Sequence, residues 1–474
     1  MNIEIKNIWK KKAVEVLELI EKKEISALEV LTSNMDRIKK VNPEINALVT
    51  IDDEKAESLI VRNQSNTTTI LKNMPVLIKD ISDVKNMKTT YGSRLYQNNI
   101  PKKSDIIVTN IENSGGIILG KTNVPEFAAG SHTYNQLFGL TKNPWNTNLS
   151  AGGSSGGSAA ALATGMAWFA TGTDLGGSLR NPASWCGITG LRPTPGLVPH
   201  GPSKFPFFSL NVNGPMARNV EDLCIFLDAM VNYNNRDPLA FKKENISYYA
   251  DLKTSKNEKY LIGYTDDFGI YPCDKEVRDM MSNTIRLVES LGHNVSQDFP
   301  DMSEAEDTFQ TIRAFMFYSL YGSLLKSDKK LIKEEVIWNI NKGRELQLDQ
   351  LVRAEISRAK IYNNAMNFFD KFDFLIVPSS VVTPFAAQEK WVKKVEGVIF
   401  NNYVSWLMIA ASISLTGCPS LALATSISKN GAPFGIQIVA APHEEKKLLR
   451  FANILEENVN ISDIIPINSN NEPL

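Results

Sequence analysis

Two serines flanked by glycines are the residues of this chain best suited to chemistry. Ser154 lies in Gly-Gly-Ser-Ser-Gly-Gly-Ser, and Ser178 ends the run Thr-Asp-Leu-Gly-Gly-Ser. Glycine lets the backbone approach a ligand closely, and a tight turn of glycines can direct successive N–H groups at one anion. Acyl transfer needs such donors because the carbonyl oxygen becomes an oxyanion, and losing one donor costs about 2.7–4 kcal/mol of barrier. Ser178 can therefore be a nucleophile and also part of an oxyanion-binding loop.

A flexible Gly/Ser linker is the alternative interpretation of this stretch. It fits poorly, because the small residues at 159–163 predict a helix and residues 168–171 predict a buried strand. We therefore interpret the glycines as part of a structured site.

Lys79 is the candidate base. It ends the apolar run Met-Pro-Val-Leu-Ile and precedes Asp80. A lysine in this position is usually a solvated strand end. The alternative is a desolvated lysine, because burial disfavours the ammonium and lowers the pKa, which makes a usable base. Asp80 would oppose deprotonation if it faced the same way, but neighbours on a strand point to opposite faces.

The stretch 149–195 resembles the signature of the amidase signature family of serine amide hydrolases. The family's glycine–serine loop, helix, strand and Thr-Asp-x-Gly-Gly-Ser run occur here in the same order. The pattern continues through Arg180, Pro182, Cys186-Gly187 and Gly190-Leu191-Arg192-Pro193-Thr194. The family also carries its catalytic lysine in a Pro-Val-x-x-Lys-Asp context, which is the context of Lys79. The resemblance reaches a Gly-x-Pro…Gly-x-Gln-Ile ending and so covers essentially the whole chain.

The resemblance implies a Ser–Ser–Lys triad, with Ser178 as nucleophile, Ser154 as a bridge in a cis peptide, and neutral Lys79 as base. A hydroxyl is a weak nucleophile until a neighbour takes its proton, so protons are expected to pass from Ser178 through Ser154 to Lys79 and later back to the leaving amine. The resemblance also implies an oxyanion hole of four backbone N–H groups and three residues that support the loop. The first set is Leu175, Gly176, Gly177 and Ser178, and the second is Ser155, Asp174 and Arg180.

Two short motifs suggest other chemistries. Residues Gly115 to Thr122 match the phosphate-loop pattern Gly-x-x-x-x-Gly-Lys-Thr, so a P-loop nucleotide-binding protein is a remote alternative. That motif needs a flexible loop and then a helix, but Gly-Ile-Ile-Leu is a strand composition and Pro125 follows. Gly152-x-Ser154-x-Gly156 also matches a nucleophile elbow, which needs a downstream carboxylate and histidine. Of the four histidines in the chain, His443 is expected at the surface.

The elements that must position these residues alternate between strands and helices, which predicts an α/β fold. The resemblance implies one large domain over residues 1–474, with a mixed, mostly parallel twisted sheet between helix layers. Within it we expect an N-terminal helical segment at 1–60, a signature core at 61–220, and the remainder of the sheet at 221–474. A helical insertion at 303–371 is expected to contribute to the substrate pocket. Its aromatic residues are interpreted either as core or as a lining for the acyl group: Phe309, Phe315, Phe317, Tyr318 and Tyr321.

Composition limits the other classes of function. The 474 residues are 43% hydrophobic and carry a net charge of −1, which does not suggest binding to nucleic acid or to an anionic membrane. No run approaches the roughly 18–20 apolar residues of a membrane span. Four dispersed cysteines and the absence of an export signal favour the cytoplasm. We expect no cofactor and no metal, because neither a dinucleotide fingerprint nor a ligand cluster with metal-binding spacing is present.

The sequence favours a stand-alone amidase that acts on a small-molecule carboxamide or an aryl or acyl amide. The alternative is the glutaminase component of a tRNA-dependent amidotransferase, its A subunit, which shares the fold and the triad. Residues 394–398 (Lys-Val-Glu-Gly-Val) and 403–406 resemble the free amidases more than that component. The sequence leaves the identity of the amide and a homodimeric state open.

Overall fold

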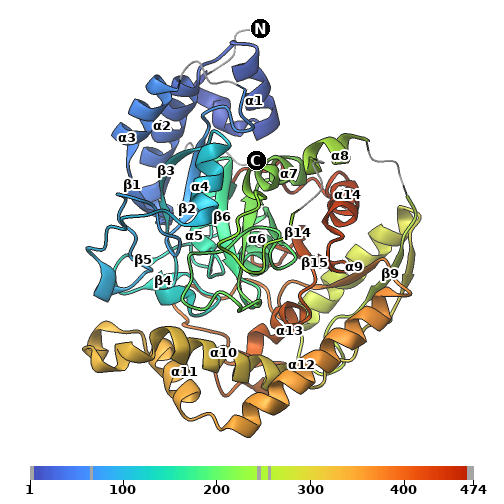
Figure 1. The fold of residues 1–474 in the computed structure, drawn as a ribbon. Helices are drawn as coiled ribbons and strands as arrows, with labels where there is room; N and C mark the ends of the chain where they lie inside the picture. The colour runs from blue at the N-terminus through green and yellow to red at the C-terminus, as the bar shows by residue number, and fades with distance from the viewer. Residues whose placement is uncertain (1–4, 64–67, 243–246, 255–257, 467–474) are drawn as a thin grey trace.

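A sheet of 11 strands runs through the molecule in the order β1-β3-β2-β6-β8-β7-β14-β15-β11-β9-β10 (Figure 1). The structure is a computed structural model that describes residues 5–63, 68–242, 247–254 and 258–466. The strands of this sheet are β1 (Leu48–Ile51), β2 (Pro75–Lys79), β3 (Ile117–Thr122), β6 (Phe169–Asp174), β7 (Thr189–Arg192), β8 (Val212–Ala217), β9 (Leu261–Tyr264), β10 (Asn294–Ser296), β11 (Phe374–Pro378), β14 (Ser420–Ile427) and β15 (Pro433–Val439). Two short hairpins form separate sheets, β4 (Tyr134–Asn135) with β5 (Gly139–Leu140) and β12 (Lys394–Val395) with β13 (Val398–Ile399).

Parallel pairing occurs in two regions of the sheet. β2 pairs in parallel with β3 and with β6, and β9 pairs in parallel with β10 and with β11. Antiparallel pairs connect these regions through β8, β7, β14 and β15. Because parallel strands end at the same edge, Lys79 at the end of β2 and Asp174 at the end of β6 lie at one edge of the sheet.

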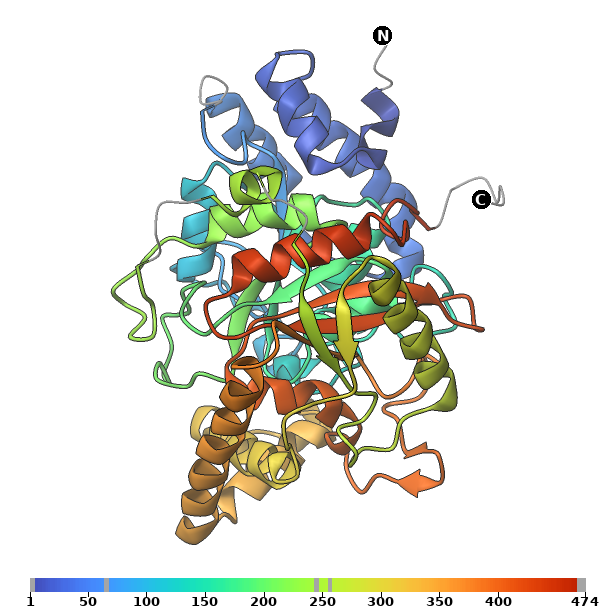
Figure 2. The ribbon, with the colours of Figure 1, turned by 90° about the vertical axis from the view of Figure 1, so that its right-hand side faces the viewer.

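Helices cover both faces of the sheet (Figures 1 and 2). The alternation of β2 side chains shows how the two layers are divided. Val76 and Ile78 pack in the core cluster formed with α7 and α14, whereas Leu77 packs with the alanines of α5. The α-helices are α1 (Ala13–Glu21), α2 (Ala27–Ile45), α3 (Asp53–Arg62), α4 (Ile106–Asn113), α5 (Gly156–Ala163), α6 (Arg180–Cys186), α7 (Val220–Met230), α8 (Tyr248–Thr254), α9 (Lys275–Ser290), α10 (Ala305–Tyr321), α11 (Glu334–Arg344), α12 (Leu348–Phe369), α13 (Met408–Thr416) and α14 (Glu445–Glu456).

The α/β fold expected from the sequence is confirmed, as one domain with a mixed sheet between helix layers. The glycine–serine stretch is structured, since the predicted helix at 159–163 is part of α5 and the predicted strand at 168–171 is part of β6. The insertion at 303–371 is mostly helical and forms α10, α11 and α12. These helices lie at the end of the molecule opposite α1–α3 (Figure 1).

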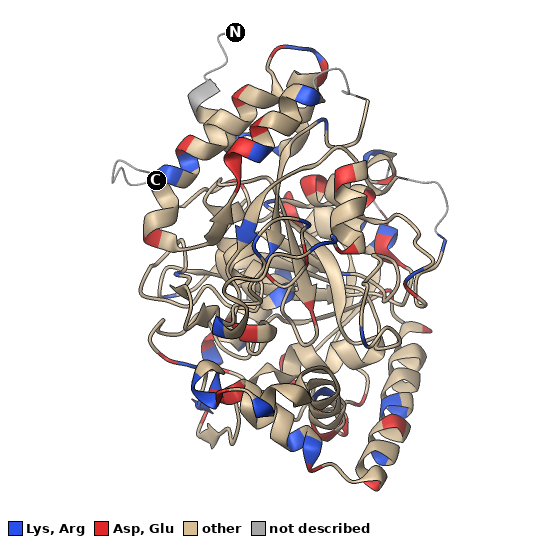
Figure 3. Cartoon of the chain, turned by 60° about the vertical axis from the view of Figure 1, so that its left-hand side comes forward, with Lys and Arg blue, Asp and Glu red and all other residues tan. Residues whose placement is uncertain are grey.

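Acidic and basic residues alternate along the helices at both ends of the molecule (Figure 3). This mixture agrees with the net charge of −1. Among the residues that the structure describes, no helix has the length and apolar character needed to cross a bilayer.

Candidate active site

Lys79 is fully buried at the end of β2, on the face of the sheet that α5 covers. It points to the same side as Leu77, because side chains two apart on a strand share a face. Its Nζ lies 2.7 Å from Ser154 Oγ, 2.9 Å from Ser155 Oγ and 2.7 Å from Thr173 Oγ1. The fold therefore places one buried amine among three hydroxyl groups.

The environment of Lys79 favours the neutral amine. Burial lowers the pKa of Lys79 to about 7, and the carboxylate of Asp174 opposes that shift. Asp80 does not share this space: its carboxylate accepts hydrogen bonds from the N–H and hydroxyl of Thr90 and lies 3.7 Å from Lys121 Nζ. The adjacent acid therefore has partners of its own on the other side of the strand.

The loop that precedes α5 carries Ser154. Gly152 has φ +74°, a conformation that favours glycine, and the Gly153–Ser154 peptide bond is cis, as the resemblance implies. Two hydroxyls hold the loop in place, because Ser131 Oγ donates to the Gly153 carbonyl and Thr133 Oγ1 donates to the Gly152 carbonyl, both at 2.8 Å. The Ser154 hydroxyl is thus presented on a loop whose preceding two residues are held by hydrogen bonds.

Ser178 lies on the loop between β6 and α6. Gly177 precedes it with φ +112°, a conformation that L side chains rarely adopt, and Ser178 is half-buried. In the part of the chain that the structure describes, no hydrogen bond joins the Ser178 hydroxyl to Ser154 or Lys79. The structure therefore brings Lys79, Ser154 and Ser155 into direct contact and places Ser178 on the loop that follows the strand of Thr173.

The backbone N–H groups of this second loop differ in their partners. Those of Leu175, Gly176 and Ser178 form no hydrogen bond with any described residue, whereas the N–H of Gly177 donates to Asp174 Oδ1 at 2.9 Å. Unengaged donors on one loop suit the stabilisation of an oxyanion. Three of the four expected donors are thus available, and Gly177 differs because the Asp174 carboxylate holds its N–H.

Asp174 connects the Ser178 loop to the core. Its carboxylate accepts the N–H groups of Gly177 and Leu179 at 2.9 and 3.0 Å, and two further hydrogen bonds from the guanidinium of Arg180 at 3.0 and 2.9 Å. Burial on its own would raise the pKa of Asp174, but the guanidinium groups of Arg180 and Arg192 hold it well below its usual range. A permanently ionised carboxylate therefore fixes both ends of the loop.

Sequence reasoning did not single out three residues of this network. Thr173 contacts the amine of Lys79. Strand alternation could have indicated this residue, because Thr171 lies on the same face of β6 and its Oγ1 accepts the Lys79 backbone N–H at 3.0 Å. Ser414 and Gln437 accept hydrogen bonds from Arg180 at 2.8 and 2.5 Å. They lie more than 200 positions away along the chain. Gln437 is part of the Gly-x-Gln-Ile ending, but no local pattern connects either residue with Arg180.

The insertion reaches the Ser178 loop through Phe309 of α10. A Cβ on Gly176 would lie 2.8 Å from Phe309 Cζ, so the loop and the ring are in close contact. Phe317 is also buried, whereas Phe315 and Tyr318 are 37% and 43% exposed. Phe309 is therefore a buried core residue that connects the insertion to the Ser178 loop.

The phosphate-loop hypothesis is wrong for this chain. The proposed loop forms β3, and Lys121 is fully buried within that strand. Its Nζ donates to Thr89 Oγ1 at 3.0 Å and pairs with Asp80, and Thr122 Oγ1 hydrogen-bonds Ser158 Oγ at 2.7 Å. Neither side chain can reach a phosphate group.

The nucleophile-elbow hypothesis fails for a different reason. The side chain in contact with the Ser154 hydroxyl is the amine of Lys79, and no described histidine contacts it. His132, which precedes the Ser154 loop in the chain, hydrogen-bonds Ser150 Oγ at 2.7 Å and the Ala387 carbonyl at 3.0 Å. His443 is exposed, as expected.

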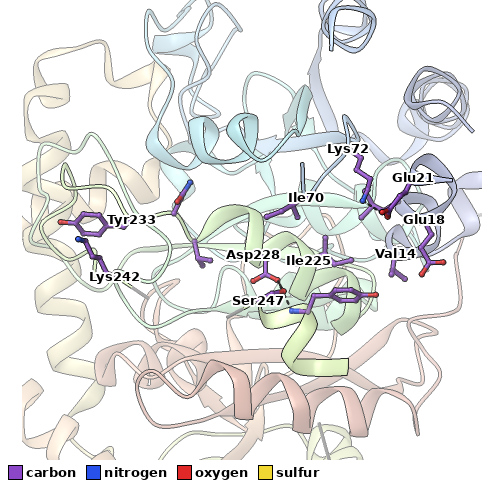
Figure 4. Close-up of a pocket in the computed structure, with 14 residues that line it drawn as sticks. Val14, Glu18, Glu21, Ile70, Lys72, Ile225, Asp228, Tyr233, Lys242 and Ser247 are labelled. Carbon is purple, nitrogen blue, oxygen red and sulfur yellow. Dashed lines mark hydrogen bonds and ion pairs between the residues drawn. The ribbon is translucent and has the colours of Figure 1, made fainter. Parts of the chain in front are cut away.

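A cavity of about 810 Å³ lies between α1, α7 and α8 (Figure 4). Val14 and Ile225 contribute apolar side chains, and Lys72 forms an ion pair of 3.1 Å with Glu21 at one end. The segment of Ile70 and Lys72 precedes the first residue of β2, so this cavity lies near the edge of the sheet opposite Lys79. None of the described residues that line it belongs to the Ser154 or Ser178 loop.

Within the described ranges, no group of three or more His, Cys, Asp or Glu side chains is arranged to hold a metal ion. The candidate site consists of hydroxyl groups, one amine, backbone N–H groups and a buried carboxylate–guanidinium network. This set can move protons and stabilise a developing negative charge.

Comparison with known proteins agrees with this chemistry. The Amidase family model matches residues 29–449. The A subunit of the glutamyl-tRNA(Gln) amidotransferase of Thermoanaerobacter pseudethanolicus is 31% identical over 94% of this chain and 95% of its own length. A solved bacterial aryl acylamidase of the amidase signature enzymes superposes with a TM-score of 0.89 at 24% identity, covering 96% of this chain and 99% of that one. The solved A subunit of the glutamyl-tRNA(Gln) amidotransferase of Thermotoga maritima gives a TM-score of 0.74 at 22% identity, with 98% of each chain covered.

Proposed function

The chain belongs to the amidase signature family and is a hydrolase acting on amide C–N bonds, and we propose that it cleaves a small-molecule carboxylic acid amide through a seryl acyl-enzyme. In this proposal Ser178 is the nucleophile, Ser154 is the bridge and Lys79 is the base. The products are a carboxylic acid and ammonia or an amine.

The contact between Lys79 Nζ and Ser154 Oγ is the observation that carries this proposal. A neutral primary amine has two N–H donors and one lone pair. Ser155 and Thr173 offer hydroxyl acceptors at 2.9 and 2.7 Å, which leaves the lone pair for the Ser154 hydroxyl. The lowered pKa of Lys79 supports the neutral state that this arrangement needs.

The proton relay follows from these positions. Ser178 Oγ attacks the amide carbonyl carbon, its proton passes to Ser154 Oγ, and the Ser154 proton passes to Lys79 Nζ. The relay then runs in reverse and protonates the nitrogen as the C–N bond breaks, because an unprotonated amine leaves poorly. Water attacks the acyl-enzyme by the same relay, which releases the acid and restores Ser178.

The oxyanion formed in each half-reaction is stabilised by the backbone N–H groups of Leu175, Gly176 and Ser178. The N–H of Gly177 holds the loop instead, through Asp174. Asp174 and Arg180 keep these donors in position before substrate arrives, and such preorganisation is the main source of oxyanion stabilisation in enzymes.

Labelling with a fluorophosphonate tests the nucleophile directly. We expect the purified enzyme to be labelled at Ser178, and Ser178→Ala to lose both labelling and amide hydrolysis. The control is Ser203→Ala, which removes the hydroxyl of a serine outside the two glycine–serine loops. Labelling that persists in Ser178→Ala would show that another residue is the nucleophile.

A second candidate function is the glutaminase component of a tRNA-dependent amidotransferase. The 31% identity to the A subunit of such an enzyme favours it. The stand-alone amidase is preferred because the backbone follows the aryl acylamidase more closely, with TM-scores of 0.89 against 0.74. The free-amidase-like residues 394–398 also form a hairpin, in which Glu396 and Gly397 have φ values of +46° and +85°.

Purification under mild conditions separates the two functions. A stand-alone amidase is expected to purify without another protein and to hydrolyse members of an amide panel on its own. A glutaminase component is expected to purify with a partner and to release ammonia from glutamine alone. We infer a cytoplasmic location for either function, because all four cysteines are buried free thiols: Cys186, Cys224, Cys273 and Cys418.

A further inference from the structure

A cavity of about 150 Å³ between α10 and α11 is not used by the proposed reaction. We call it the Arg313 cavity and define it by Arg313, Ala314, Trp338, Asn339, Lys342 and Val404. It carries two cationic side chains, and none of the described residues that line it is Asp or Glu. A space of this size holds about five water molecules, which is enough for a carboxylate and the carbons next to it.

Arg313 is a buried cation without an acidic partner. It is 6% exposed, and its guanidinium lies 4.3 Å from the ring centroid of Phe317 and 5.3 Å from that of Tyr403. It donates a hydrogen bond to Asn339 Oδ1. Among the described residues, no carboxylate lies within ion-pair distance of it. Burying a charge costs free energy unless it is paired, and aromatic faces offset only part of that cost.

Three acids in this region have other partners, and Glu306 accepts a hydrogen bond from Gln310 at 2.9 Å. Glu335 lies 3.9 Å from Lys333 Nζ, and Glu126 accepts the backbone N–H of Lys333 at 2.5 Å. Lys342 stands at the exposed side of the Arg313 cavity, with its amine 5.9 Å from the centroid of the Trp338 ring. The charged groups that line the cavity are therefore the guanidinium of Arg313 and the ammonium of Lys342, whereas the amide of Asn339 is already hydrogen-bonded to Arg313, Glu335 and Tyr403.

Helix α10 lines the Arg313 cavity and also contacts the Ser178 loop, although no described residue of that loop lines the cavity. Phe309 touches the loop at Gly176, and Arg313 follows one turn later on α10. Four residues of an α-helix span about 6 Å along its axis. An extended aliphatic chain of a few carbons can cover a separation of that order.

We propose that the Arg313 cavity is a carboxylate-binding subsite, and that the substrate is an amide whose acyl chain ends in a carboxylate. The guanidinium of Arg313 binds the carboxylate through two parallel N–H groups, the geometry that makes arginine selective for planar anions. The amide end of the same molecule then lies at Ser178. This inference rests on the proposed amidase function and names the substrate class of that site.

Two matched series of substrates test the subsite. One contains succinamic, glutaramic, adipamic and suberamic acids, and the other contains unbranched alkanamides in which a methyl group replaces the carboxylate. Wild-type enzyme is expected to prefer the carboxylate series at the best chain length. Arg313→Gln is expected to lower kcat/KM for that series about tenfold or more, mainly through KM, because a hydrogen bond to a charged group is lost. The alkanamides are expected to change little, and Arg313→Lys to keep part of the preference.

Arg353→Gln is the matched control, because Arg353 is an exposed arginine on α12, and it is expected to leave both series unchanged. The proposal is overturned if Arg313→Gln slows both series equally, which would mean that Arg313 only joins the two helices. It is also overturned if the wild-type enzyme prefers the alkanamides. Thermal unfolding of each variant shows whether the fold is retained.

Binding without turnover keeps the subsite testable if no amide of either series is hydrolysed. Suberate is expected to bind wild-type enzyme in isothermal titration calorimetry. Its affinity is expected to be lower for Arg313→Lys and lowest for Arg313→Gln. Absence of suberate binding to the wild type overturns the subsite. Fluorophosphonate labelling of Ser178 reports separately on the amidase chemistry, so failure of the subsite and failure of the proposed function give different results.

Discussion

Lys79 Nζ and Ser154 Oγ lie 2.7 Å apart although 75 positions separate the two residues in the chain. β2 carries the amine to the edge of the sheet, and the loop before α5 carries the hydroxyl to the same place. The amine is fully buried and surrounded by hydroxyl groups. In the proposed relay, the charge state of this amine decides whether Ser154 can give up a proton.

The rate of amide hydrolysis is expected to rise with pH and then level off. In the proposed mechanism Lys79 acts as a base only when neutral, and its pKa is lowered to about 7 by burial. Below that value the ammonium form predominates, so kcat/KM is expected to fall about tenfold for each unit of decreasing pH. Measurement of kcat/KM for an uncharged amide between about pH 5 and pH 9 checks this expectation. An inflection near the ordinary pKa of lysine would contradict it.

Replacement of Lys79 by methionine is expected to affect amides more than esters. The side chain keeps its length and loses the base, and positioned proton transfer typically contributes about 10²–10⁴ to the rate. The loss is expected at the upper end of that range for an amide and to be smaller for an ester of the same acyl group, because an alkoxide leaves with less help from a proton. Paired kcat/KM values on one amide and its matching ester provide the measurement. Equal losses on both substrates would count against the proton relay.

Removal of the Thr173 hydroxyl is expected to shift the acid limb of the pH profile. Its oxygen lies 2.7 Å from Lys79 Nζ and stabilises the ammonium form more than the neutral amine. Thr173→Val is therefore expected to lower the apparent pKa of Lys79 and to move the inflection to lower pH. Thr171→Val is the control, because Thr171 Oγ1 accepts the backbone N–H of Lys79 and not its amine. The same shift in both variants would show that the Thr173 contact is not its cause.

Asp174→Asn is expected to destabilise the whole fold. The substitution removes the carboxylate that pairs with Arg180 at 2.9 Å and Arg192 at 3.3 Å and leaves both buried guanidinium groups uncompensated. Breaking a buried ion pair from one side costs about 3–5 kcal/mol, and we expect a loss of this size in the free energy of unfolding from denaturant titration. Asp279→Asn removes an exposed acid that pairs with Lys275 and is expected to leave stability unchanged. A variant Asp174→Asn as stable as the wild type would mean that the network does not hold the Ser178 loop.

Much of the local structure could be predicted because it depends on neighbours in the chain. The capping box of Ser26 and Glu29 starts α2, since the Ser26 hydroxyl accepts the Glu29 N–H and Glu29 accepts the Ser26 N–H. The strand composition of Gly-Ile-Ile-Leu argued against a phosphate loop, and β3 occupies that position. The alternation of β2 predicted that Asp80 would face away from Lys79, and its partners Thr90 and Lys121 confirm this.

Other parts of the site could not be predicted from local patterns. Arg180 reaches Ser414 and Gln437 across more than 200 positions of the chain, and Arg313 reaches Asn339 on another helix. The hydrogen bond from the Gly177 N–H to the Asp174 carboxylate was also not predicted. Each of these contacts depends on which elements pack together, and residue spacing does not encode that information.

By itself, the sequence determined the two glycine–serine loops, the α/β class and the family to which they point, because backbone freedom and strand or helix periodicity are properties of adjacent residues. Only the tertiary structure decided that Lys79 is desolvated and in contact with Ser154, that Lys121 is equally buried but paired with Asp80, and that no described carboxylate pairs with Arg313. Burial and pairing of charge depend on the whole set of surrounding atoms, and that set is assembled from segments far apart in the chain.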